Sequence, residues 1–151
     1  MGKSIYPLVA EYKGSNPSDD FVVRAKYIQV KQLSCKEHGI QYGKRDTCWK
    51  CGTADLIKQD KKLICFYVNL KEYKTSVSDV LDKTTQNWKW DSTKVFGRVV
   101  AVSLKTFGTD LTALLNSLKA VEGFKVINQI TEAELEEAWK KEQNNKLLRQ
   151  L

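Results

Sequence analysis

The 151-residue chain lacks most of the features that catalysis or membrane insertion requires. It contains one histidine, one methionine and two prolines, and no run of 18 or more apolar residues. Its start, MGKSIYPL, has no apolar signal-peptide core, so we expect a cytoplasmic protein with no membrane partner. The phosphate-binding, dinucleotide-binding and serine-hydrolase motifs are absent. These absences favour a protein that is not an enzyme.

The most informative residues that the chain does contain form a cysteine and histidine cluster. Cys35, His38, Cys48 and Cys51 follow the pattern C-x2-H-x9-C-x2-C. Two ligands separated by two residues can face one ion from a tight turn, and three thiolates with one imidazole complete the tetrahedral shell of a structural Zn²⁺. The site would use the single histidine and leave no open position for a catalytic water.

The other interpretations of these cysteines are a disulfide, a redox pair and coincidence. A redox pair at Cys48 and Cys51 would follow a strand and open a helix, whereas a segment rich in Gly, Lys and Asp precedes it here. Nothing in the sequence indicates an oxidising compartment. Cys65 lies in the apolar run LICFYVNL and is predicted to be a small buried hydrophobic residue.

The apolar patterning predicts an α+β fold with an OB-like or small β-barrel core. An inserted zinc knuckle loop, residues 33–53, would connect two long strands. We expect a β-rich nucleic-acid-binding domain over 1–130 and a helix over 131–151, packed on that domain or on a partner. Strands are expected at 5–12, 21–33, 63–73, 95–107 and 124–130, a turn at 59–61, a loop around Trp88 and Trp90, and a helix at 110–120.

The charge of the chain favours a polyanionic partner. The formal net charge is +7, and residues 1–74 carry 14 Lys and Arg against 8 Asp and Glu. Basic and aromatic residues interleave, as in proteins that bind single strands by stacking and phosphate contacts. A solvated lysine-rich surface is the other interpretation of the charge. The candidate contacts are Arg24, Lys26, Tyr42, Lys44, Arg45, Trp49, Lys50, Tyr67, Trp88 and Trp90.

Five segments of the sequence together resemble one protein family. The segments are FVVRAKYIQV, the knuckle ending in CWKC, ICFYVNLKEYK, KVFGRVVAVSL and KTFGTDLTALLNSL. They are similar to the zinc-containing single-stranded-DNA-binding proteins of large tailed phages, over residues 21–127. The resemblance implies an OB-type barrel with an inserted zinc subdomain and binding of single-stranded DNA without base specificity. It also implies that the protein is viral, takes part in DNA replication and acts in the host cytoplasm. RNA remains open as a ligand.

A different class of function is also compatible with the sequence. The zinc loop and the C-terminal helix could form the contact face of a protein-interaction module, such as a phage factor that docks on a host polymerase or nuclease. In an extended segment Trp88 and Trp90 would share one face. There they would either stack on bases or anchor a protein partner.

Overall fold

The computed structural model describes residues 5–41 and 46–150. Within these ranges the chain has a mixed α+β fold with a seven-stranded, mostly antiparallel sheet and three α-helices, which confirms the expected fold class. It divides into two compact units, one formed by Met1–Tyr27 with Ile64–Leu151 and one formed by Ile28–Leu63. We call these the core unit and the knuckle unit.

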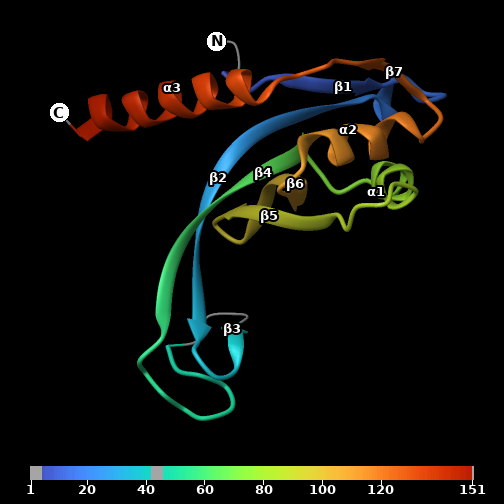
Figure 1. The fold of residues 1–151 in the computed structure, drawn as a ribbon. Helices are drawn as coiled ribbons and strands as arrows, with labels where there is room; N and C mark the ends of the chain where they lie inside the picture. The colour runs from blue at the N-terminus through green and yellow to red at the C-terminus, as the bar shows by residue number, and fades with distance from the viewer. Residues whose placement is uncertain (1–4, 42–45, 151) are drawn as a thin grey trace. The chain divides into compact units, whose positions relative to one another are not determined.

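The sheet has the strand order β5-β6-β4-β2-β1-β7, with β3 paired to β2 (Figure 1). The pairings of the described residues do not close it into a barrel. Both β2 and β4 continue from the core unit into the knuckle unit. The strands are β1 (Leu8–Tyr12), β2 (Phe21–Cys35), β3 (Gly39–Gln41), β4 (Ile57–Leu70), β5 (Lys89–Val95), β6 (Arg98–Gly108) and β7 (Phe124–Ile127).

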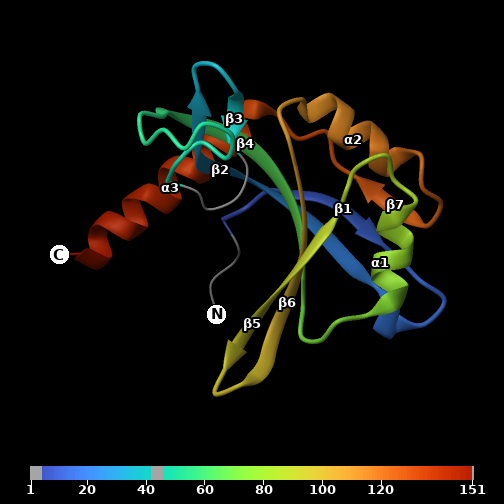
Figure 2. The ribbon, with the colours of Figure 1, turned by 90° about the horizontal axis from the view of Figure 1, so that it is seen from below.

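The apolar core lies entirely in the core unit. One face of the sheet contributes alternate side chains to the core cluster, such as Val23 and Ala25 in β2 and Phe66 and Val68 in β4. The helices α1 (Thr75–Asp82) and α2 (Leu111–Lys119) lie next to each other in both views (Figures 1 and 2). Their apolar faces, including Leu81, complete the core.

The helices expected at 110–120 and 131–151 are confirmed, and each begins at a capping residue. The Asp110 carboxylate accepts a hydrogen bond of 3.2 Å from the Ala113 amide at the start of α2. Thr131 and Glu134 form the reciprocal capping box at the start of α3 (Glu132–Gln150), with both bonds between 3.2 and 3.3 Å. Among the described helices, none combines the length and apolar character that crossing a membrane requires.

Two local expectations are wrong. Residues 59–61 lie inside β4 rather than in a turn, because an exposed strand can carry a polar run such as QDKK. The segment expected as a loop around Trp90 is β5, which pairs with β6 to form a hairpin. Gly97 lies in the hairpin turn, while the register shift opposite Thr93 and Lys94 leaves Val100 as the extra residue.

Candidate metal centre

Two short turns in the knuckle unit position the four candidate ligands. Cys35 ends β2 and His38 lies in the turn that leads to β3, while Cys48 and Cys51 lie in a second turn. A glycine follows the second ligand of each pair, at Gly39 with φ 77° and Gly52 with φ 71°. Both glycines occupy the left-handed region that other residues avoid, and this reverses the chain after each pair. The glycine after each ligand pair is visible in the sequence, but the prediction of the site used only the spacing of the ligands.

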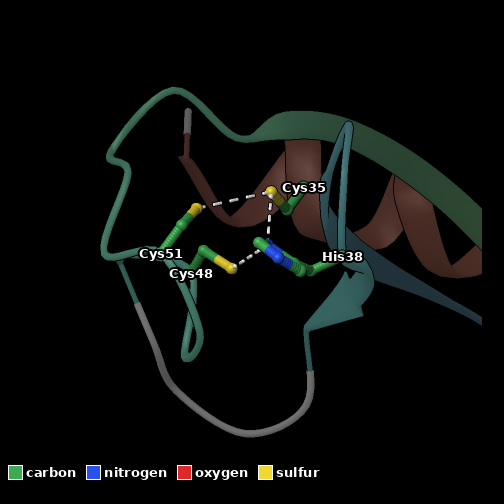
Figure 3. Close-up of side chains that lie close together, drawn as sticks. All are labelled: Cys35, His38, Cys48 and Cys51. Atoms are coloured by element: carbon green, nitrogen blue, oxygen red, sulfur yellow. Dashed lines mark hydrogen bonds between the residues drawn. The ribbon is translucent and has the colours of Figure 1, made fainter.

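Three of the six separations between donor atoms are close to those of a tetrahedral zinc shell. Zn–S and Zn–N bonds of about 2.3 and 2.05 Å give tetrahedral edges of about 3.8 Å for S···S and about 3.6 Å for S···N. The Cys35 and Cys51 sulfurs are 3.8 Å apart, and the His38 Nδ1 atom lies 3.6 Å from Cys35 Sγ and 3.4 Å from Cys48 Sγ. All four donors lie within 4.8 Å of one another and face a common centre (Figure 3).

These separations also exclude a disulfide in this arrangement. A disulfide needs an S–S distance of about 2.05 Å, and all four cysteines of the chain are free thiols. The chemistry of the donor set, three sulfurs and one imidazole nitrogen, fits a structural Zn²⁺ with no coordination position left for a substrate. The predicted ligands Cys35, His38, Cys48 and Cys51 therefore form a possible metal site.

Gln41 supports the second turn, and its role was not predicted. Its side chain is buried, and Nε2 donates to the Gly39 carbonyl at 3.1 Å and to the Cys48 sulfur at 3.6 Å. Its Oε1 accepts from the Trp49 amide at 3.0 Å. Gln41 thus ties β3 to the Cys48 turn and orients one sulfur. A glutamine next to a ligand pair carries no pattern that sequence reasoning recognises.

Hydrogen bonds prepare Cys48 for the thiolate form that binds metals. Burial raises the pKa of the Cys48 thiol, but hydrogen bonds from the Cys51 and Lys50 amides and from the neighbouring thiols outweigh this effect and lower the pKa to about 6. The opposite holds for Cys65, where burial raises the pKa to about 11. The prediction of Cys65 as a small buried residue is confirmed, because it has no exposed surface.

The knuckle unit has no apolar core in its described part. Its buried side chains there are Cys35, Gln41 and Cys48, which are two candidate ligands and the glutamine that supports one of them. A segment of this size cannot offset its loss of conformational entropy without burying apolar area. A metal bound at the Cys/His cluster would supply the stabilisation that apolar burial does not provide here.

The candidate nucleic-acid contacts of the knuckle unit are only partly described. Trp49 and Lys50 are exposed, and the Lys50 ammonium lies 5.1 Å from the centre of the Trp49 ring. The other three candidates, Tyr42, Lys44 and Arg45, lie outside the described residues.

In the core unit the structure brings Arg24, Lys26 and Tyr67 together. The Lys26 ammonium lies 5.4 Å from the ring centres of both Tyr67 and Tyr6, and the Arg24 guanidinium donates to the Tyr6 carbonyl at 3.0 Å. Tyr67 is only 6 % exposed, so its ring supports Lys26 rather than presenting an open stacking surface.

Trp88 and Trp90 occupy different environments. The Trp88 ring packs against the apolar core, and its Nε1 atom donates to the Thr84 hydroxyl at 3.0 Å. Trp90 is 62 % exposed and lies beside Tyr73, with ring centres 5.9 Å apart. Packing against the core therefore explains the presence of Trp88, whereas core packing does not explain the exposed Trp90.

Comparison with known proteins adds no relative. The chain matches no family model, no curated protein and no solved structure.

Proposed function

We propose that this protein binds single-stranded nucleic acid, with DNA as the expected ligand, through phosphate and stacking contacts of low sequence specificity. In this proposal the Cys/His cluster holds a structural Zn²⁺ that orders the knuckle unit. The phage-family resemblance of residues 21–127 supports the proposal, together with the +7 charge. The OB-like barrel and a role in viral DNA replication belong to the same proposal.

The observation that carries the proposal is a row of lysines across four neighbouring strands. Lys105 in β6 pairs directly with Lys89 in β5 and with Tyr67 in β4, so these three side chains lie on one face of the sheet. Lys26 of β2 extends the row through its contact with the Tyr67 ring. The face opposite to this row carries the apolar core.

The lysine row consists of Lys26, Lys89 and Lys105. None of the three lysines forms an ion pair with a carboxylate in the part of the chain that the structure describes. Strands in a sheet are about 4.8 Å apart, so the row extends over about 15 Å. Positive charges repeated over such a length suit a phosphate backbone better than a small anion.

The proposed metal has a supporting role. Zn²⁺ at Cys35, His38, Cys48 and Cys51 would hold the turn that carries Trp49 and Lys50, an exposed aromatic and basic pair. The closed donor set supplies no chemistry, in agreement with a binding function.

The test is a titration of labelled poly-dT and mixed-sequence oligonucleotides at several salt concentrations. We expect similar affinities for both sequences and a steep loss of affinity with salt. Replacing Lys26, Lys89 and Lys105 together with Gln should reduce the slope of log K against log salt by about 2, at about 0.7 per phosphate contact on a single strand.

The matched control replaces the exposed residues Lys119, Lys125 and Lys140 with Gln, which changes the net charge equally. We expect it to retain most of the slope. A salt-independent affinity, or an equal loss of slope in both triple variants, would contradict a binding face on the lysine row.

A protein-docking role is the second candidate. Adjacent leucines near the end of α3, Leu147 and Leu148, are 60 % and 67 % exposed. Two leucines open to solvent are typical of a helix that packs on another protein. A pull-down with the wild-type protein should return one stoichiometric partner that survives nuclease treatment. Loss of that partner in a Leu147→Gln, Leu148→Gln variant would support this candidate.

A further inference from the structure

The hairpin of β5 and β6 has an unusual residue at its turn. Val95 pairs with Arg98, so the turn consists of Phe96 and Gly97 alone. Both have positive φ, 52° and 78°. Two-residue turns of this kind favour Asn-Gly or Asp-Gly, because most side chains destabilise the left-handed conformation at the first position. Phe96 is the only residue other than glycine with positive φ among the described residues.

Burial of the Phe96 side chain does not offset the cost of its left-handed backbone conformation. Its side chain is fully exposed, at 102 %, and the adjacent Val95, Val99 and Val100 are each about half exposed. The turn projects beyond the rest of the core unit (Figure 2). Neither backbone preference nor burial therefore explains a phenylalanine here. Strained positions that the fold does not require are concentrated at functional sites.

The charge around the hairpin tip, residues 94–98, indicates the kind of partner that the tip contacts. Lys94 and Arg98 flank the turn and are exposed, and the sequence has no acidic residue between Ser92 and Thr109. Two copies of this tip would repel each other, whereas a polyanion would be attracted. An exposed aromatic ring between two cations matches the stacking and phosphate contacts of single-strand binding.

A second aromatic site lies along the same hairpin. Tyr73, Trp90, Val99 and Val102 line an open hollow of about 530 Å³, to which Lys71 also contributes. The Trp90 ring is tilted by 55° to that of Tyr73. Val99 thus connects this hollow to the exposed apolar tip, and the hairpin offers aromatic surface at its base as well as at its turn.

We infer that the β5–β6 hairpin is an insertion element that stacks Phe96 on an unpaired nucleobase, while Lys94 and Arg98 contact the flanking phosphates. This inference rests on the proposed binding of single-stranded nucleic acid. It assigns that function a specific contact outside the lysine row of Lys26, Lys105 and Lys89.

The test is Phe96→Asn, measured by fluorescence anisotropy with labelled dT oligonucleotides and by thermal melting. Asparagine suits the turn better than phenylalanine, so we expect a higher melting temperature. Loss of one stacking contact should weaken binding about 5- to 150-fold. Because no charge is removed, the salt slope should be unchanged. Phe96→Trp keeps an aromatic ring and should retain wild-type affinity.

Two further variants isolate the contributions of the tip. Val126→Thr removes exposed apolar surface from β7 and should leave binding unchanged. Lys94→Gln should reduce the salt slope by about 0.7, as expected for one lost phosphate contact on a single strand.

The outcomes separate this inference from the function on which it rests. Wild-type protein without affinity for dT would contradict the proposed function. Wild-type binding with equal affinity in Phe96→Asn would overturn the hairpin inference alone. A wild-type dimer in sedimentation that becomes monomeric in Phe96→Asn, with unchanged oligonucleotide affinity, would assign the tip to self-association and also overturn it.

Discussion

The two units of this protein differ in the side chains that they bury. The core unit buries a cluster of 17 apolar residues, and none of them comes from Ile28–Leu63. The knuckle unit buries two cysteines and a glutamine in its described part. Apolar burial stabilises the first unit, whereas the second would be stabilised by the ion that the proposed function assigns to its Cys/His cluster. The comparison shows what a metal at the Cys/His cluster would contribute, namely order in a unit without an apolar core.

Removal of one ligand should have the largest effect and act on one unit. We expect Cys48→Ala to abolish stoichiometric Zn²⁺ binding and to disorder the knuckle unit, because apparent binding energies of structural zinc are about 10 to 16 kcal/mol. Metal content by mass spectrometry and amide spectra would measure this effect. Cys65→Ala, at a buried cysteine that is not a ligand, should keep full metal content.

A cavity in the core unit should have the reverse effect. Leu81 is fully buried, so Leu81→Ala should lower the free energy of unfolding of the core unit by about 2 to 5 kcal/mol. Below the melting temperature the variant should still bind one Zn²⁺. Denaturant titration would measure the loss, and the exposed Leu147→Ala should change it by less than about 0.5 kcal/mol.

The support of Cys48 by Gln41 gives a smaller prediction within the knuckle unit. Gln41→Ala removes the side chain that orients the Cys48 turn, and we expect Zn²⁺ affinity to fall about 10- to 100-fold. Competition with a chromogenic chelator would measure the affinity. Gln59→Ala, at an exposed position of β4, is the matched control, and an equal loss in both variants would remove the role assigned to Gln41.

The smallest expected effect concerns the cap of α3. Thr131→Ala removes the hydroxyl that accepts from the Glu134 amide and should destabilise the core unit by about 1 kcal/mol. Thr112→Ala removes an exposed hydroxyl from α2 and should be neutral or slightly stabilising. Thermal melting of the two variants would show whether the capping box contributes as described.

Sequence reasoning worked where a residue pattern has one physical explanation. The spacing of Cys35, His38, Cys48 and Cys51 identified the donors, and the apolar patterning predicted helices at 110–120 and 131–151, where α2 and α3 lie. These signals are local, since each depends on residues within about one turn or one loop of each other.

It failed where the structure depends on pairing between segments. The polar strand β5 has no apolar face of its own, and its conformation follows from its register with β6. The row of Lys89 and Lys105 could not be recognised before that register was known. The turn at Phe96 was missed because phenylalanine occupies a position where asparagine would have signalled a hairpin.

Hydrogen exchange of the wild-type protein, before and after removal of metal by a strong chelator, tests the central claim most directly. The Cys48 and Gly52 amides of the knuckle unit donate to backbone carbonyls at 2.9 Å. We predict that removal of the metal abolishes the protection of these amides from exchange. Amides of β4 and β6 within the core unit should keep theirs. Unchanged protection of both units after complete loss of metal, or equal loss in both, would contradict the claim that the metal orders the knuckle unit alone.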